Sequence, residues 1–288
     1  MTSYSEHYFE NSSGLKLYYR RHGADKPGTP VVCLPGISRN SRDFHEIAEH
    51  MAAQRPVIAM DFRGRGLSDW DPQWRNYQPA TYAADVLELL DELGMARVVL
   101  FGTSLGGLVS MIISANSPER VAAVTLNDIG PAIGAKGLAR IMAYIGRAAP
   151  AANWDEAVAQ ARETYGIAWP GLSDDEWLIQ ARRGYRENDA GVPVVDLDPM
   201  VGEAARTVIA RPEDPWVLFD KTAAKPVLLL HGETSDILTF DIVDRMIEKK
   251  PDLVHVVVSN RGHVPILDEP ECITGIDEFL GEVEKTIA

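Results

Sequence analysis

A serine flanked by glycines is the residue in this sequence with the clearest potential for chemistry. Ser104 lies in the pattern Gly-x-Ser-x-Gly, which residues 102–106 form. An apolar run at 98–101 precedes it, and apolar residues at helical spacing follow it over 105–112, so a strand, a tight turn and a helix are predicted in that order. The glycines suit such a turn, because strand and helix pass too close together for a Cβ atom. We interpret Ser104 as a nucleophile.

A serine hydroxyl needs a base that removes its proton as it attacks, and His263 is the best candidate. Histidine suits this role because its unperturbed pKa lies close to neutral pH. Among the seven histidines of the chain, His263 follows an apolar run at 253–258 and lies between Gly262 and Val264. Loops at strand ends commonly carry catalytic groups, so we predict that His263 is the base.

The histidine in turn needs a buried carboxylate, which fixes its tautomer and stabilises its charged form. The acids that follow predicted strands in the interval between Ser104 and His263 are Asp128, Glu233 and Asp236. We favour Asp236, because it follows a strand and the chain order Ser, Asp, His is typical of this arrangement. Asp128 stays as the main alternative, and Glu233 is the third candidate.

When the serine attacks a carbonyl carbon, negative charge develops on the carbonyl oxygen and must be met by hydrogen-bond donors. The N–H of Leu105 is one candidate, since it opens the predicted helix and lies at the positive end of the helix dipole. The other is the N–H of Ile37, on the loop after an apolar run at 31–34. Pro35 has no N–H to donate, and Gly36 allows the loop to turn towards the site.

Buried strands must position these groups at one edge of a sheet. Continuously apolar runs are typical of strands that are covered on both faces, and they occur at 31–34, 57–60, 98–101 and 121–126. The strand pattern resumes at 226–230 and 253–258. Helical patterns alternate with them at 42–53, 79–93, 105–116, 239–249 and 270–287. This alternation predicts a parallel sheet with helices on both faces, preceded by an antiparallel hairpin at 4–22. Catalytic groups gather at the carboxyl ends of parallel strands, so the predicted site residues should meet there.

The alternation stops between residues 131 and 222, where helical patterns dominate. Ser173 and Glu176, for example, form a capping box ahead of an apolar helical pattern. We therefore predict one α/β core domain made of 1–130 and 223–288, interrupted by a helical insertion at 131–222.

Composition and charge narrow the class of protein. With 288 residues, 45% of them hydrophobic, the chain is long and apolar enough for a large core. The formal net charge of −14 disfavours nucleic acid and anionic membranes as partners. No apolar run reaches the roughly 18 residues of a membrane span, and residues 1–14 lack the pattern of a secretion signal. Cys33 and Cys272 are predicted as buried thiols, which is compatible with a reducing compartment. We expect a cytoplasmic protein that acts on a small molecule. Its oligomeric state is not predicted.

Several motifs together resemble the α/β-hydrolase superfamily. They are Leu34-Pro35-Gly36, Asp61-Phe62-Arg63-Gly64-Arg65-Gly66-Leu67-Ser68, Gly102-Thr103-Ser104-Leu105-Gly106-Gly107 and Gly262-His263-Val264-Pro265. The resemblance covers residues 1–130 and 223–288, with a helical cap at the position of the insertion. It implies an α/β-hydrolase fold with an eight-stranded, mostly parallel sheet, a Ser-Asp-His triad, and no metal or organic cofactor. Pro35 departs from the histidine that many relatives carry there, and Ser104 differs from the aspartate nucleophile of epoxide hydrolases and haloalkane dehalogenases.

The resemblance leaves the substrate open. Capped serine members include carboxylesterases, enol-lactonases and hydrolases that cleave carbon–carbon bonds in aromatic degradation. Aromatic residues that could line a pocket are Trp154, Trp169 and Trp177 of the insertion and Trp70 after the strand at 57–60. We expect a serine hydrolase that cleaves an ester or lactone of a small to medium, largely apolar substrate. The alternatives are a carbon–carbon hydrolase with the same triad and a small-molecule receptor on the same scaffold without turnover.

Overall fold

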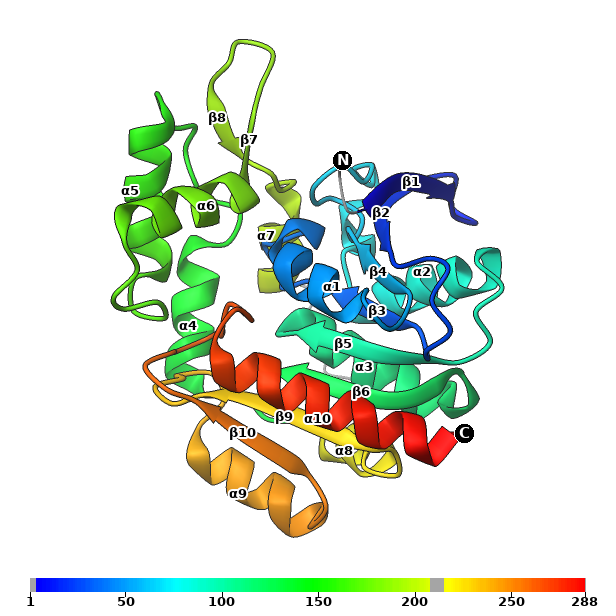
Figure 1. Ribbon diagram of the computed structural model, residues 1–288. Coiled ribbons are helices and arrows are strands. Elements are labelled where there is room, and N and C mark those ends of the chain that lie inside the picture. Colours follow the sequence, from blue (N-terminus) through cyan, green and yellow to red (C-terminus); the bar gives the residue numbers. More distant parts are fainter. Residues whose placement is uncertain (1–3, 208–214, 288) are drawn as a thin grey trace.

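The computed structural model describes residues 4–207 and 215–287 and contains an eight-stranded sheet (Figure 1). Its strands are β1 Tyr4–Glu10, β2 Lys16–His22, β3 Val31–Leu34, β4 Val57–Met60, β5 Val98–Thr103, β6 Val121–Asn127, β9 Val227–Gly232 and β10 Val254–Val258. They lie in the order β1-β2-β4-β3-β5-β6-β9-β10. β2 is antiparallel to both of its neighbours, and every other neighbouring pair is parallel. The predicted eight-stranded, mostly parallel sheet is confirmed.

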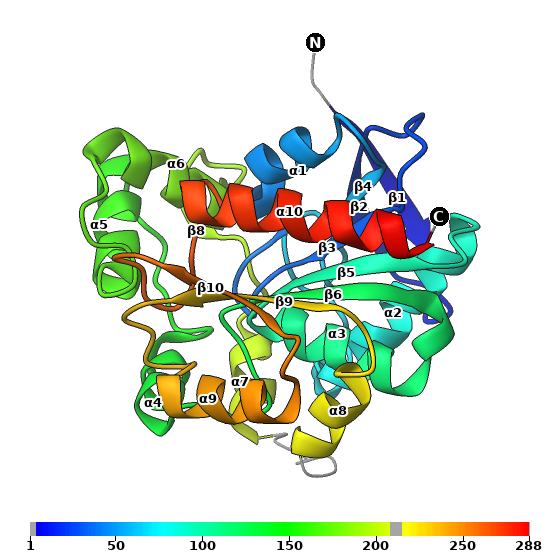
Figure 2. The same ribbon diagram turned by 60° about the horizontal axis from the view of Figure 1, so that its bottom comes forward.

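Helices connect the strands and cover both faces of the sheet. They are α1 His45–Met51, α2 Pro79–Glu92, α3 Leu105–Asn116, α4 Ala135–Tyr144, α5 Trp154–Tyr165, α6 Asp174–Gly184, α7 Met200–Thr207, α8 Pro215–Thr222, α9 Phe240–Lys249 and α10 Pro270–Ile287, with short 3-10 helices η1 Ser41–Phe44, η2 Trp74–Asn76 and η3 Pro118–Arg120. α1 and α10 lie on one face, and α2, α3, α8 and α9 lie on the other (Figure 2). Among the helices that the structure describes, none is both long enough and apolar enough to cross a membrane.

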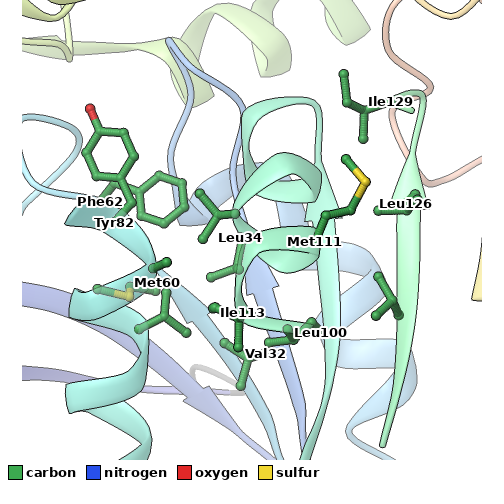
Figure 3. Close-up of a cluster of buried hydrophobic side chains, with 14 of the residues drawn as sticks. Val32, Leu34, Met60, Phe62, Tyr82, Leu100, Met111, Ile113, Leu126 and Ile129 are labelled. Atoms are coloured by element: carbon green, nitrogen blue, oxygen red, sulfur yellow. The ribbon is translucent and has the colours of Figure 1, made fainter. Parts of the chain in front are cut away.

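Two apolar cores result from the alternation of side chains along the buried strands. In β3, Val31 and Cys33 pack beneath α1 and α10, whereas Val32 and Leu34 point to the opposite core and pack against side chains of α3 (Figure 3). Both faces of the strand are therefore covered, which explains why every one of its residues is apolar. Cys33 and Cys272 are free and buried, as predicted.

The segment predicted as an insertion, 131–222, contributes α4 to α8. In the parts of this segment that the structure describes, no strand joins the eight-stranded sheet. α4, α5 and α6 lie at the end of the sheet where β5, β6 and β9 finish (Figure 2), and the predicted capping box of Ser173 and Glu176 is present at the start of α6. α8 packs against α3. The division into a core domain and a cap stays a prediction.

A small hairpin within this segment was not predicted. β7 Tyr185–Glu187 pairs with the antiparallel β8 Pro193–Val195 in a separate two-stranded sheet. The turn closes through a hydrogen bond from the N–H of Asn188 to the carbonyl of Val192. Strands of three residues are too short to show a two-residue period in the sequence, so no local pattern announces them.

Candidate active site

Ser104 lies at the sharp turn between β5 and α3. Its backbone has φ 51° and ψ −113°, a left-handed conformation that is strained for a residue with a side chain. A Cβ atom on Gly102 would meet the backbone of Gly106 and Gly107, and one on Gly106 would meet the carbonyl of Leu34. The glycines are thus required by the close approach of α3 to the sheet, and the turn leaves Ser104 partly exposed.

The structure brings His263 to Ser104. The Oγ of Ser104 lies 2.9 Å from the Nε2 of His263, which is hydrogen-bond distance. His263 lies on the loop after β10, and its side chain is only 7% exposed. In the neutral imidazole, a ring nitrogen without a proton accepts from the serine hydroxyl, so Nε2 is placed to receive the Ser104 proton.

The carboxylate that contacts His263 belongs to Asp128. Its Oδ2 lies 2.7 Å from the Nδ1 of His263, and its side chain is fully buried. The N–H of Gly232 donates to Oδ1 at 2.8 Å, and the hydroxyl of Ser235 donates to Oδ2 at 2.6 Å. These donors hold the carboxylate in one orientation. Asp128 therefore favours the tautomer with the proton on Nδ1, which leaves Nε2 free to accept from the serine.

Asp236, the acid that the sequence analysis favoured, lies elsewhere. Its carboxylate accepts hydrogen bonds from Arg140 of α4, with Nε at 2.8 Å from Oδ2 and Nη2 at 2.7 Å from Oδ1. These hydrogen bonds and the charges of Arg140 and His263 lower the pKa of Asp236, and partial burial opposes them. The expectation that Asp236 is the partner of His263 is wrong.

The two loops explain this difference. Asp128 directly follows β6, which neighbours β5 in the sheet, and its φ of 55° turns the chain at once. Asp236 comes one residue later than Ser235, which already occupies the place beside the Asp128 carboxylate. Glu233, the third candidate, accepts a hydrogen bond from the N–H of Asn260 instead. The choice among the three acids thus depends on how the loops turn, because all three follow strands that end at the same edge.

The loop after β3 lies against Ser104, as the predicted oxyanion hole requires. A Cβ atom on Gly36 would lie 3.8 Å from the Cβ of Ser104, and the Nε of Arg65 donates to the carbonyl of Ile37 at 3.0 Å. Leu105 is the first residue of α3, and N–H groups in a first helical turn have no acceptor within the helix. The assignment of the Ile37 and Leu105 N–H groups as oxyanion donors stays a prediction.

Of the four tryptophans singled out in the sequence, Trp169 contacts the loop that carries His263. Its Nε1 donates to the carbonyl of Val264 at 2.7 Å. Trp177 packs against Trp169 in a cluster of the insertion, and Trp154 donates to a side chain of β7. Trp70 is 48% exposed. The rings of Trp154 and Trp177 are thus used for packing within the insertion, and a role in substrate binding stays a prediction for all four.

A group of polar side chains on the loop after β3 and beside it was not predicted from the sequence. The Oγ of Ser38 lies 3.2 Å from the hydroxyl of Tyr165, and the guanidinium of Arg39 lies 5.5 Å from the centre of the Tyr165 ring. Arg39 is buried and forms an ion pair with Asp43. Their adjacency to Ile37 is the one signal in the sequence that could have drawn attention to Ser38 and Arg39.

The arrangement is suited to nucleophilic chemistry. A serine hydroxyl that is linked through an imidazole to a buried carboxylate can lose its proton as it attacks an electrophilic carbon. The three side chains come from the loops after β5, β6 and β10, at the carboxyl ends of parallel strands. Within residues 4–207 and 215–287, no group of three or more His, Cys, Asp or Glu side chains is placed to hold a metal ion.

Comparison with known proteins identifies the family. A family model described as alpha/beta hydrolase fold matches residues 29–270. The chain is 27% identical over 276 residues to the 3-hydroxybutyrate-oligomer hydrolase of Cupriavidus necator and 30% identical over 269 residues to the 2-(acetamidomethylene)succinate hydrolase of Mesorhizobium japonicum, and each match covers 92% of both chains. The crystal structure of an alpha/beta hydrolase from Novosphingobium aromaticivorans is similar with a TM-score of 0.93 and 38% identity, over 98% of this chain and 99% of that one. The protein therefore belongs to the α/β-hydrolase family and is a hydrolase.

Proposed function

We propose that the protein hydrolyses a carboxylic ester or lactone of a small to medium molecule, with Ser104 as the nucleophile. The observation that carries this proposal is the 2.9 Å contact between the Oγ of Ser104 and the Nε2 of His263, with Asp128 on the opposite ring nitrogen. Two relatives that match most of the chain are named as hydrolases of an oligomer of 3-hydroxybutyrate and of 2-(acetamidomethylene)succinate. Their names support a small organic molecule as the substrate.

In the first half of the reaction, the Oγ of Ser104 bonds to the carbonyl carbon while its proton passes to the Nε2 of His263. Asp128 stabilises the imidazolium that forms. The N–H groups of Ile37 and Leu105 bind the negative charge on the carbonyl oxygen. The bond from the carbonyl carbon to the leaving oxygen then breaks, Nε2 gives its proton to that oxygen, and the acyl group stays on Ser104.

In the second half, a water molecule replaces the alcohol. Its oxygen bonds to the acyl carbon while one of its protons passes to the Nε2 of His263. The bond to the Oγ of Ser104 breaks, and Nε2 returns the proton to this oxygen. One water is consumed, and an acid and an alcohol are formed; a lactone yields both groups in one product.

A fluorophosphonate probe tests the nucleophile directly. We expect it to label Ser104 in the folded protein, as mapped by mass spectrometry, and to leave Ser104→Ala unlabelled. Ser110 is a buried serine of α3, the helix that follows Ser104, so Ser110→Ala is the matched control and should retain labelling. Absence of labelling in folded wild-type protein would overturn the proposal.

A substrate panel separates the alternatives. We expect hydrolysis of 4-nitrophenyl esters or lactones, with kcat at least about 10³-fold lower in Ser104→Ala. Cleavage of a vinylogous diketone without ester turnover would identify a carbon–carbon hydrolase instead. Tight ligand binding that survives Ser104→Ala, together with negligible turnover, would identify a receptor.

A further inference from the structure

A row of polar side chains begins at the loop beside Ser104. The Oγ of Ser38, on this loop, lies 3.2 Å from the hydroxyl of Tyr165. The ring of Tyr165 meets the ring of Tyr144 edge-on, with 6.0 Å between their centres. Tyr144 lies one helical turn after Arg140 on α4, and residues at this spacing project from the same side of a helix. The row therefore runs from the predicted oxyanion loop to the guanidinium of Arg140.

One edge of the Arg140 guanidinium remains available for a ligand. Its Nε and Nη2 donate to Asp236, whereas Nη1 makes no hydrogen bond within the part of the chain that the structure describes. The Arg140 side chain is 21% exposed, and Nη1 is not sealed off from solvent. Asp236 follows Ser235, whose hydroxyl donates to the Asp128 carboxylate that contacts His263, so the Arg140–Asp236 ion pair lies beside the catalytic residues. Asp236 thus orients Arg140 near the catalytic histidine.

Tyr144 carries a hydroxyl that no residue in 4–207 or 215–287 engages in a hydrogen bond. Burial and the neighbouring Tyr165 raise the pKa of Tyr144, whereas the charges of Arg140 and Arg39 lower it. The ring of Tyr165 contacts both the Tyr144 ring and the Arg39 guanidinium, and Arg140 lies one turn before Tyr144 on α4, so both guanidinium groups lie near Tyr144. Arg39 is paired in the same way as Arg140. The Nε and Nη2 of Arg39 donate to the carboxylate of Asp43, and its Nη1 does not.

We propose that Arg140 and Tyr144 bind a carboxylate group of the substrate. The planar edge of a guanidinium presents two donors in the geometry that a carboxylate accepts, and the Tyr144 hydroxyl adds a third donor. An entirely apolar substrate would remove these groups from water without offering them hydrogen-bond acceptors, and this would cost binding free energy. The inference rests on the proposed ester hydrolysis and names its substrate class, namely an ester that carries a free carboxylate, such as a monoester of a small dicarboxylic acid. It replaces the expectation of a largely apolar substrate.

Two substrates that differ only in charge test this site. 4-Nitrophenyl hydrogen adipate carries a free carboxylate, and its methyl ester does not; release of nitrophenolate is measured for both. We expect the wild-type ratio of kcat/KM, acid over methyl ester, to be at least about 10. The ratio should fall about 10- to 100-fold in Arg140→Gln and about 3- to 10-fold in Tyr144→Phe, mainly through the KM of the acid.

The controls separate a binding role from a structural one. Arg140→Gln leaves the Asp236 carboxylate without its partner, so the double variant Arg140→Gln/Asp236→Asn should show the same lowered ratio. Arg147 is an exposed arginine shortly after α4, and Arg147→Gln should keep the wild-type ratio.

Two results would overturn the carboxylate site while leaving ester hydrolysis intact. The first is a wild-type ratio of kcat/KM near one. The second is an equal loss of kcat/KM for both substrates in Tyr144→Phe, because this would indicate that Tyr144 has a structural role only. If neither ester is hydrolysed and the fluorophosphonate probe fails to label Ser104, the proposed function itself is overturned.

Discussion

The Oδ2 of Asp128 lies 2.7 Å from the Nδ1 of His263, although 135 positions separate the two residues in the chain. Gly232, the last residue of β9, and Ser235, on the loop after it, donate to the same carboxylate. The loops after β6, β9 and β10 therefore converge on one carboxyl group. The Asp128 carboxylate both carries the negative charge and sets the orientation of the imidazole, so its loss should affect the position of the base as well as its electrostatics.

We predict that Asp128→Asn lowers kcat for a 4-nitrophenyl ester by about 10³- to 10⁴-fold. The amide has nearly the same shape as the carboxylate, but it no longer stabilises the imidazolium and allows the wrong tautomer. Asp236→Asn is the matched comparison and should lower kcat by less than about 10-fold. Near-normal turnover in Asp128→Asn with a collapse in Asp236→Asn would restore Asp236 as the catalytic acid.

We predict that Gly106→Ala lowers the free energy of unfolding by about 2 kcal/mol or more. The added methyl group would run into the backbone carbonyl of Leu34, which cannot move without displacing β3. Gly281 lies within α10 and has open space around its Cβ position. Gly281→Ala should therefore raise the free energy of unfolding by about 0.5–1 kcal/mol. Urea titrations measure both values, and equal effects of the two substitutions would contradict the packing argument.

We predict that His22 destabilises the native state as the pH falls. Its side chain is buried, and both ring nitrogens lack a hydrogen-bond partner among the described residues. Burial, helped by the charges of His45 and Arg20, lowers the pKa of His22 from 6.5 to about 4. The unfolded chain therefore binds a proton near pH 6.5, whereas the native state does so only near pH 4. The free energy of unfolding should decrease across this window.

His22→Phe tests this dependence. The phenyl ring keeps the buried aromatic volume and cannot bind a proton. Urea unfolding of both proteins between about pH 7 and pH 4.5 should show a steeper loss of stability in the wild type than in the variant. Parallel curves would show that another group accounts for the acid sensitivity.

Local patterns were sufficient to predict the sheet and the turn at Ser104. The run at 57–60 becomes β4 with the same bounds, because a strand that is covered on both faces requires an apolar residue at every position. The turn at Ser104 was predictable from its glycines: the clash that a Cβ on Gly102 would make is local, although the one on Gly106 would be with Leu34 of β3. His263 was predictable because it lies on the short loop that follows β10, at the carboxyl end of a parallel strand.

Only the tertiary structure decided which carboxylate meets His263 and which side chain pairs with Asp236. Asp128 and Asp236 both follow strands that end at the same edge of the sheet, so their positions in the chain do not distinguish them. The backbone turn at Asp128, with φ 55°, selects it together with two donors more than a hundred positions away, at the end of β9 and on the loop after it. Arg140 meets Asp236 in the same way, across 96 positions of the chain. Residue type and spacing determine where strands, turns and reactive groups occur, but contacts between distant loops arise only when the chain has folded, and no local pattern records them.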